Sequence, residues 1–536
     1  MTSELSTRID QVKVIKEHQF PEDASAMSHP IRPDEVMEMN NFYTVTVYDK
    51  GAEVIRMLWN IIGEKAFKAG INTYFARFDG QAVTCDDFVD AMQSVTDIDL
   101  SHFRLWYSQS GTPKLTVELN EHNRTLCLSQ HTPETANQAT KQAIPILLDY
   151  RCYDESGQNI PLDLTSESTT QLEGNKFLLN GDSAVISVGG TSSLDKITTT
   201  FNANFSSPII VERKVDVDSL AKVALYDSDS FNRWDAIQEL YNYEINCAEQ
   251  GALKTSEQFD SVFSAILSHG DSNEETAEFL SLPSVESLIQ KRSNVDVEAL
   301  CNARTKFISI LANTYYEKLV SALESITKQA YNYNNQQVSA RWLRKSILSI
   351  IAYDKRSAEV IKSTYEYADN MTDTLSALSA AQYCDLSLFD ELMVNFESKW
   401  KDDSLVIDKW FALHATTERT DILSQLTLLQ EHAVFNKNNP NRVRSLIGSF
   451  GFYNKKGFHE KDGSGYKFLT DYLLKLDGIN PQVAARMVTP LTQFQNLAQC
   501  HEEKMRKQLS RLINHKNLSK DLFEKVSKAL AYGQKS

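Results

Sequence analysis

The feature that most constrains the fold is a stretch of more than 300 residues, from about residue 214 to the C-terminus, that holds four prolines. Amphipathic segments follow one another along it, for example Phe231 to Glu249, Val297 to Ala330 and Val338 to Tyr353. Apolar residues in these segments recur at the spacing of one helix face. Because each apolar face must be buried against a neighbour, the stretch predicts stacked helix pairs in an irregular α-solenoid.

The residues from about 112 to 213 follow a different period. Short β-prone runs alternate with turn signals such as Asn180-Gly181-Asp182. The runs are Leu115 to Leu119, Thr125 to Ser129, Ile144 to Cys152, Lys176 to Leu179, Ala184 to Val188, and Ile209 to Val211. Several short strands in about 100 residues predict a small β-sandwich.

Residues 1 to 111 are mostly helical in pattern. Thr44 to Tyr48 alternates Thr and Val and predicts one strand, which a polar turn and a helix follow. Thr84 with Asp87 resembles a capping box, and Leu100 to Tyr107 predicts a last short helix. The chain is therefore expected to be multi-domain and mainly α, with parts at 1–111, 112–213 and 214–536.

Composition narrows the classes of function. The formal net charge is −16, which argues against a general nucleic-acid binder. No apolar run is long enough to span a membrane, and the polar start lacks a signal-peptide core. Seven dispersed cysteines without a C-x-x-C pair predict buried free thiols in a reducing compartment, which is the cytoplasm by default.

Familiar catalytic motifs are missing from the sequence. There is no H-E-x-x-H zinc motif and no G-x-S-x-G elbow, so no metal ligands are predicted. His459 and His501 each begin such a zinc motif without completing it, and we expect both to be surface residues. The glycine-rich run Asp462 to Tyr466 is expected to be a turn between helices.

Four residues have two interpretations each. Tyr43 and Tyr48 read most simply as core or half-buried aromatics near a strand-to-helix turn, and five residues apart they need not point together. Arg444 and Arg486 read most simply as surface residues or as partners in ion pairs between helices.

Several longer segments carry a family resemblance. They include His29-Pro30-Ile31-Arg32-Pro33, the run from Asn40 to Met57, Asp99 to Pro113, Asn439 to Gly448, and Asn480 to Arg486. In this order they resemble bacterial aminopeptidase N, a family of zinc metallopeptidases of the gluzincin group, over essentially the whole chain. The resemblance implies that residues 1–111 are the C-terminal part of a thermolysin-like catalytic domain.

The resemblance also implies roles for the four residues. In this family zinc activates a water, a glutamate acts as general base, and a tyrosine hydroxyl stabilises the oxyanion of the tetrahedral intermediate. That tyrosine falls on Tyr48, and Tyr43 falls on a position that lines the substrate site. Arg444 and Arg486 would face the cavity that the helical domain encloses, where a guanidinium can hold a peptide carbonyl or carboxylate. Peptide substrates and a monomer are implied as well.

One departure from the family's pattern limits what the resemblance implies about catalysis. The family's zinc ligands, general base and Gly-Ala-Met-Glu-Asn-type segment precede the point where this chain begins. We therefore expect zinc only in a complete enzyme and doubt activity of this chain by itself, unless a separately made N-terminal half complements it. A stand-alone binding or scaffold protein, built from a β-sandwich and an α-solenoid, remains the alternative.

Overall fold

The structure is a computed structural model. It describes residues 3–35, 38–120, 122–136, 138–154, 157–158, 160, 162–163, 168–188, 197–268, 271–326 and 329–531. The chain divides into two compact units. We call Thr7–Ala236 the sandwich unit, and Met1–Ser6 together with Ile237–Ser536 the helical unit.

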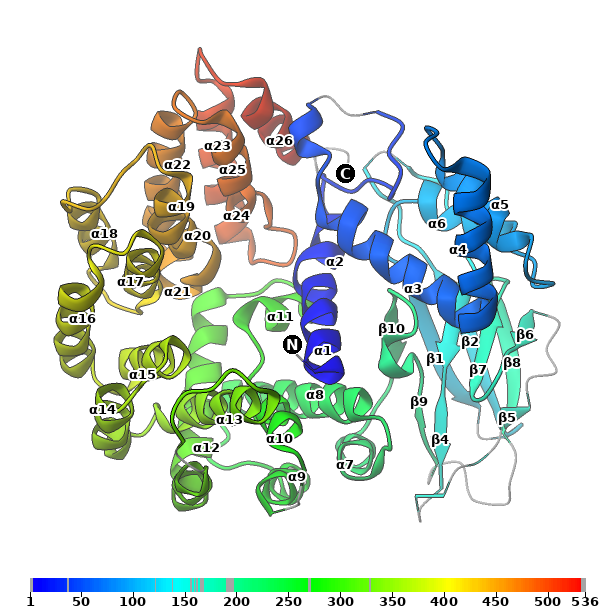
Figure 1. Cartoon of the computed structure of the whole chain (residues 1–536), viewed down its shortest axis with the longest axis horizontal. Helices are drawn as coiled ribbons and strands as arrows, with labels where there is room; N and C mark the ends of the chain where they lie inside the picture. The colour runs from blue at the N-terminus through cyan, green and yellow to red at the C-terminus, as the bar shows by residue number, and fades with distance from the viewer. Residues whose placement is uncertain are drawn as a thin grey trace. The chain divides into compact units, whose positions relative to one another are not determined.

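The sandwich unit combines a set of helices with a β-domain (Figure 1). Its helices are α1 (Glu4–Val14, which starts in the helical unit), η1 (Ile15–Gln19), α2 (Phe20–Asp23), η2 (Met39–Asn41), η3 (Thr46–Lys50), α3 (Gly51–Ile62), α4 (Glu64–Phe78), α5 (Cys85–Gln93), η4 (His102–Arg104), α6 (Leu105–Ser108), η6 (Ala203–Phe205) and α7 (Val217–Tyr226). Its strands are β1 (Lys114–Asn120), β2 (Thr125–His131), β3 (Ile146–Asp149), β4 (Arg151–Tyr153), β5 (Leu162–Asp163), β6 (Thr169–Gln171), β7 (Lys176–Leu179), β8 (Ser183–Val188), β9 (Thr198–Thr200) and β10 (Ile210–Arg213).

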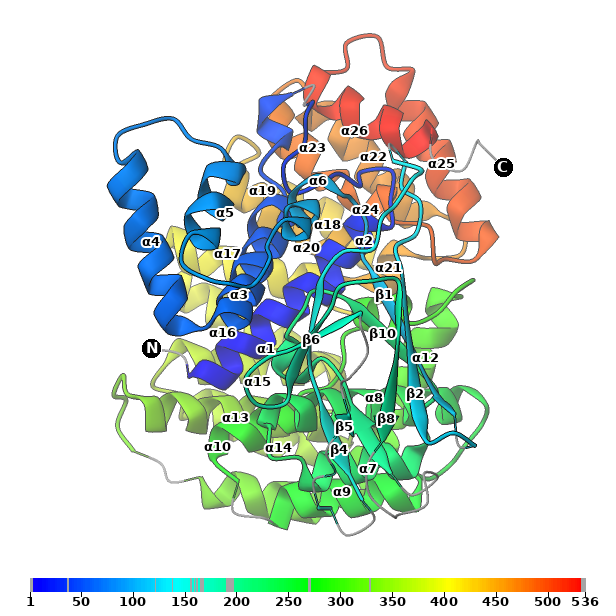
Figure 2. The same cartoon turned by 90° about the vertical axis from the view of Figure 1, so that its right-hand side faces the viewer.

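The strands among the described residues form three sheets, which Figure 2 shows from a second direction. The largest has the order β10-β1-β2-β8-β5, in which β1 and β10 are parallel and the other pairs antiparallel. The others are β3-β7-β6 and β4-β9. The predicted run Ile144 to Cys152 is divided at Tyr150 between two sheets, and the sequence pattern missed the short strands β5, β6 and β9.

One apolar core joins the helices of this unit to its sheets. Met57 on α3, Trp106 on α6, Leu128 on β2 and Phe177 on β7 belong to the same buried cluster. The Trp106 indole donates a hydrogen bond of 2.8 Å to the carbonyl of Pro145, so the largest ring in this core is also satisfied as a donor. The helical part of residues 7–111 therefore folds against the β-domain.

The helical unit is built from consecutive helices that follow one another in an arc, green to red in Figure 1. They are α8 (Ser230–Glu249, which starts in the sandwich unit), α9 (Glu257–Ser268), α10 (Asn273–Phe279), α11 (Val285–Gln290), α12 (Val297–Ser325), α13 (Asn335–Ile351), η7 (Lys355–Ser357), α14 (Ala358–Glu366), α15 (Met371–Cys384), α16 (Leu386–Trp400), α17 (Ser404–Thr416), α18 (Ile422–Gln430), α19 (Pro440–Val443), η8 (Arg444–Gly448), α20 (Ser449–Tyr453), α21 (Lys455–Phe458), α22 (Ser464–Leu476), α23 (Pro481–Met487), α24 (Thr489–Thr492), α25 (Gln499–Ile513) and α26 (Lys520–Ala531).

Many of these helices begin at a side-chain cap. Asn370, Asp385, Asp403 and Asn480 each accept hydrogen bonds from backbone N–H groups in the first turn of the helix that follows. Such caps accept hydrogen bonds from backbone N–H groups that have no partner within the helix, and each cap contributes about 1 kcal/mol to stability. Local sequence thus divides the long helical stretch into its separate helices.

The prediction that His459 and His501 lie on the surface is wrong. The residues are 4% and 1% exposed, and Nδ1 of each lies 2.8 Å from the hydroxyl of buried Tyr466. The run predicted as a turn, Asp462 to Tyr466, is one only at Asp462 and Gly463, because Ser464 begins α22. Gly465, in the first turn of this helix, lies so close to the Phe458 carbonyl that a Cβ there would lie 2.4 Å from the oxygen. This close approach places Tyr466 between the two imidazoles.

The burial of these two histidines predicts that the stability of the protein depends on pH. Burial lowers the pKa of His459 well below its ordinary value and also lowers that of His501. The unfolded chain therefore binds protons below about pH 6.5 that the folded chain excludes, so stability falls as the pH drops, by at most about 1.4 kcal/mol per pH unit for each group. We expect His459→Gln to flatten the dependence of the urea midpoint between about pH 7.5 and about pH 5.5. The exposed His122→Gln is the control, and an unchanged slope in His459→Gln would contradict the expectation.

Two further findings concern the surface and the thiols. Among the described residues, no helix is long and apolar enough to cross a membrane. All seven cysteines are free thiols. Three of them are buried, whereas Cys500 is exposed, so the expectation of uniformly buried thiols is wrong for this residue.

Candidate functional site

The run Thr44 to Tyr48, predicted as a strand, is helical from Val45 onward. A π-helical turn, η3, spans Thr46–Lys50 and continues directly into α3. The alternation of Thr and Val misled the prediction because two polar side chains of the turn, Thr46 and Lys50, point into the protein and find polar partners there. Turns of this kind are rare and occur often at functional sites.

Tyr43 and Tyr48 come together on the outside of this turn. Their rings stack with centroids 6.1 Å apart and an interplanar angle of 28°. The two residues are 55% and 60% exposed, so neither is the core aromatic that the simplest interpretation expects. Within the described part of the chain neither hydroxyl has a hydrogen-bond partner. Both are thus available to a ligand.

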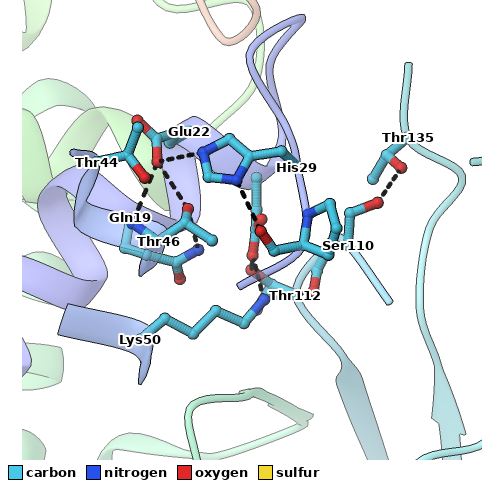
Figure 3. A network of polar contacts seen from close by, with 12 residues as sticks. Gln19, Glu22, His29, Thr44, Thr46, Lys50, Ser110, Thr112 and Thr135 are labelled. Atoms are coloured by element: carbon cyan, nitrogen blue, oxygen red, sulfur yellow. Dashed lines mark hydrogen bonds and ion pairs between the residues drawn. The ribbon is translucent and has the colours of Figure 1, made fainter. Parts of the chain in front are cut away.

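A half-buried carboxylate, that of Glu22, holds the inner side of the turn (Figure 3). Glu22 Oε1 accepts a hydrogen bond of 2.6 Å from the Thr46 hydroxyl and one of 3.3 Å from the Thr46 N–H. The Gln19 amide donates to Thr46 Oγ1 at 3.2 Å, and His29 Nε2 lies 3.7 Å from Glu22 Oε1. Burial raises the pKa of Glu22, against the opposing effect of the Thr46 hydrogen bond. Helices η1 and α2 therefore fix the start of η3.

A buried ion pair holds the end of the same turn. Lys50, 1% exposed, donates to Asp23 Oδ2 at 2.8 Å and to the Gly111 carbonyl at 2.9 Å. The Thr112 hydroxyl donates to the same Asp23 oxygen at 2.9 Å. The pair thus joins α2, η3 and the segment that enters β1, and it leaves Tyr48 facing outward between two anchored positions.

A second cation lies beside this segment. Lys141 Nζ contacts four oxygens: the Ser110 carbonyl at 2.8 Å, Ser110 Oγ at 3.1 Å, and Thr135 Oγ1 and Gln138 Oε1 at 2.9 Å each. Desolvation by burial lowers the pKa of Lys141 to about 8. These contacts fix the segment around Ser110, which precedes the carbonyl that Lys50 uses.

The residues that anchor the turn were not among the sequence candidates. Glu22 and Asp23 are adjacent acids after Pro21, within a segment that also carries the family resemblance, and this is the signal that could have pointed to them. Both are largely buried, which acidic residues rarely are without a partner.

The two candidate arginines lie in the helical unit, and both are exposed. Arg444 begins another π-helical turn, η8, and donates to Asn441 Oδ1 at 3.2 Å. Arg486 lies near the end of α23. Among the described residues neither forms an ion pair, unlike the neighbouring Arg442, which is buried against Asp408. Both guanidinium groups are therefore free to bind an anion or a carbonyl.

The structure also bears on whether this chain could hold a metal ion. In the part of the chain that the structure describes, no three or more His, Cys, Asp or Glu side chains come together in a way that could hold a metal ion. These residues thus do not fit the zinc that the family resemblance implies.

Three family models match the chain in succession. Residues 2–107 match the peptidase family M1 domain, residues 111–214 match DUF3458, described as an Ig-like fold, and residues 217–531 match DUF3458_C, described as ARM repeats. The fold class is therefore a mainly α, multidomain protein with part of an M1 peptidase domain, an Ig-like β-domain and an ARM-repeat helical domain, as the sequence predicts.

Individual similar proteins define the family more narrowly than the three family models do. The chain is 39% identical to aminopeptidase N of Haemophilus influenzae over 540 residues, and 39% identical to aminopeptidase N of Escherichia coli over 537 residues. Each alignment covers 98% of this chain and 61% of the relative, so the chain spans about three fifths of their length. The fold is also similar to the crystal structure of Legionella pneumophila aminopeptidase A in complex with aspartic acid, with a TM-score of 0.81 and 25% sequence identity. The superposition covers 94% of this chain and 58% of the Legionella chain. The chain belongs to the bacterial aminopeptidase N family.

Proposed function

We propose that this chain forms part of the active site of a zinc aminopeptidase that releases N-terminal residues from peptides. In this proposal residues 1–111 are the C-terminal part of the catalytic domain, 112–213 the β-sandwich and 214–536 the helical domain. The observation that carries it is the exposed, unpartnered Tyr48 hydroxyl on a turn that is fixed from inside, in a chain with 39% identity to aminopeptidase N.

In this proposal Tyr48 is the residue that takes part in catalysis, as a hydrogen-bond donor to the oxyanion. Attack on a peptide carbonyl places negative charge on its oxygen, and a preorganised donor stabilises that charge in the transition state. A phenol is a neutral donor at pH 7 with few rotors to freeze. Thr46 and Lys50 anchor the turn on either side of Tyr48, which supports its use as such a donor. Tyr43, stacked on it, would line the substrate site.

Arg444 and Arg486 would bind the substrate. Each presents an exposed guanidinium without an ion-pair partner in the described part of the chain, and a guanidinium can hold a carboxylate through two parallel hydrogen bonds. We assign both to the peptide carbonyl or terminal carboxylate of the substrate.

Zinc and the general base would come from residues outside this chain. When bound, zinc polarises the scissile carbonyl and activates a water. The described residues offer no ligand set for it, so this chain's own contribution is donor, pocket wall and helical domain.

The experiment compares two proteins. One is the purified 536-residue chain. In the other, the two fifths of the Escherichia coli relative that this chain does not cover are joined to the chain in frame. We expect neither tight zinc nor cleavage of aminoacyl-anilides by the chain alone, and both by the joined protein. Stoichiometric zinc or turnover in the chain alone would contradict the division of residues. An inactive but folded joined protein would contradict the proposed function and favour a stand-alone binding protein.

A further inference from the structure

The direction of the Tyr48 side chain is not fixed by packing in a core. The residue is exposed, and the ring of Tyr43 on which it stacks is exposed as well. A hydrogen-bond donor to a transition state must be held in place, because a misplacement of about 1 Å can lower a rate by about 100-fold. The backbone of the turn η3 must therefore provide most of the constraint on this side chain.

Thr46 links the interior of the protein to the backbone of Tyr48. The Gly51 N–H donates to the Thr46 carbonyl, which closes the π-helical turn, and it also donates to the Tyr48 carbonyl. The Tyr48 N–H donates to the Thr44 carbonyl at 3.2 Å. Since Thr46 and Tyr48 share one donor and lie two positions apart, a displacement of Thr46 also displaces Tyr48.

Among the residues that the structure describes, the Glu22 carboxylate forms hydrogen bonds with Thr46 alone (Figure 3). One oxygen, Oε1, accepts from the hydroxyl at 2.6 Å and from the N–H at 3.3 Å, whereas His29 Nε2 lies farther away at 3.7 Å. The Glu22 side chain is 21% exposed, in contrast to the fully enclosed pair of Lys50 and Asp23 at the other end of the turn. Glu22 can therefore be replaced with less damage to the core than that pair.

The position of Glu22 is unfavourable for its charge. Burial raises the pKa of this carboxyl, and the hydrogen bond from Thr46 and the nearby His29 offset the effect only in part. A neutral side chain at this position would avoid the penalty. Groups that are unfavourable for stability are retained at functional sites, where they fix a geometry. The contact with Thr46 therefore indicates a role in the geometry of the turn.

We infer that Glu22 is a positioning residue for catalysis, which through Thr46 holds the π-helical turn so that the Tyr48 hydroxyl stays directed at the oxyanion. The inference rests on the proposed function, because it requires Tyr48 to be the donor. Glu22 is assigned no contact with the substrate, and its effect on the reaction passes through Tyr48. Removing Glu22 should therefore slow the chemical step and leave substrate binding nearly unchanged.

A double-mutant cycle in the joined protein tests this dependence on Tyr48. Glu22→Ala should lower turnover at least about tenfold and change KM less than about threefold. Glu22→Gln, which keeps an oxygen acceptor for Thr46, should recover most of the loss. In the Tyr48→Phe background no hydroxyl remains to be positioned, so Glu22→Ala should lower turnover by less than a further factor of about two.

The outcomes separate this inference from the proposed function. Unchanged turnover in Tyr48→Phe would overturn the catalytic role of Tyr48 and this inference with it. A normal loss in Tyr48→Phe together with unchanged turnover in Glu22→Ala would overturn this inference alone. A loss from Glu22→Ala that is as large in the Tyr48→Phe background as in the unmodified protein would also overturn it, because Glu22 would then act independently of Tyr48.

Asp87→Ala is the matched control. One Asp87 oxygen accepts from the hydroxyl and from the N–H of Thr84, at 2.8 Å each, so the same kind of contact is removed at the start of α5. We expect the turnover and KM of Asp87→Ala to equal those of the unmodified joined protein. A loss of turnover as large as in Glu22→Ala would indicate general destabilisation and overturn the inference.

Hydrogen exchange on the 536-residue chain measures the turn without any catalysis. Glu22→Ala should speed amide exchange in the segment 46–51 at least about tenfold, and Asp87→Ala should leave it unchanged. Unchanged exchange in Glu22→Ala would overturn the inference even if turnover falls. If Glu22→Ala does not fold, Thr46→Val removes the same hydroxyl contact from the other side, and Thr46→Ser, which keeps the hydroxyl, is its control.

Discussion

Replacing Lys50 by Met should lower the free energy of unfolding of the sandwich unit by about 3–5 kcal/mol. Lys50 and Asp23 are 1% and 3% exposed, and Asp23 Oδ1 already lacks a partner. Without the ammonium group, the Asp23 carboxylate keeps only the Thr112 hydroxyl as a donor on its other oxygen. An uncompensated buried charge is among the most costly defects that a single substitution can create. Urea denaturation followed by circular dichroism measures the loss.

Two further variants separate charge burial from lost packing. Lys68→Met removes an exposed pair with Glu64 on α4 and should change stability by less than about 0.5 kcal/mol. The double variant Lys50→Met with Asp23→Leu removes both charges together and should recover most of the loss, because apolar pairs often replace buried ion pairs without penalty. A loss in the double variant as large as in Lys50→Met would assign the effect to packing instead.

Replacing Tyr48 by Phe should lower the turnover of the joined, active protein by about 10²- to 10³-fold. The phenol and the phenyl ring fill nearly the same space, so the stack on Tyr43 can persist while the hydroxyl donor is lost. An interaction made only in the transition state changes turnover with little effect on KM. Steady-state kinetics on an aminoacyl-anilide therefore distinguish a donor to the oxyanion from a residue that only binds substrate.

The control for this prediction is Tyr226→Phe. Tyr226 belongs to the same unit and is 70% exposed, so it tests the loss of an exposed tyrosine hydroxyl elsewhere on the surface. We expect its turnover to match that of the unmodified joined protein. Turnover in Tyr48→Phe within about threefold of the control, well short of the expected loss, would remove Tyr48 from the catalytic residues.

Local patterns predicted much of the fold. Thr84 and Asp87 form the predicted capping box, because both partners lie within one helical turn. β1, β2, β7 and β8 lie within a residue or two of the predicted runs. Buried residues alternate with less buried ones along β1, β2 and β8, and β7 is a short apolar run between turn signals, so the sequence pattern indicates all four. The family resemblance then supplied what no local pattern carries, namely the expected roles of Tyr43, Tyr48, Arg444 and Arg486.

Contacts between distant residues account for the failures. Thr46 reads as a strand residue by propensity, but its hydroxyl is held by Glu22, which lies 24 positions earlier. His501 reads as a surface residue, but its partner Tyr466 lies 35 positions away. A polar residue can be buried wherever a partner meets it, and a single sequence does not show which residues meet. The anchors behind Tyr48 were missed for the same reason.

The π-helical turn under Tyr48 also constrains how this family can vary. Such a turn contains one residue more than an α-helical turn, so it has the character of a single-residue insertion retained within a helix. One residue added or removed between Thr46 and Lys50 would rotate the following positions by about 100° and take one anchor away from its partner. The length of this segment therefore matters to the placement of Tyr48 as much as the two anchoring side chains do.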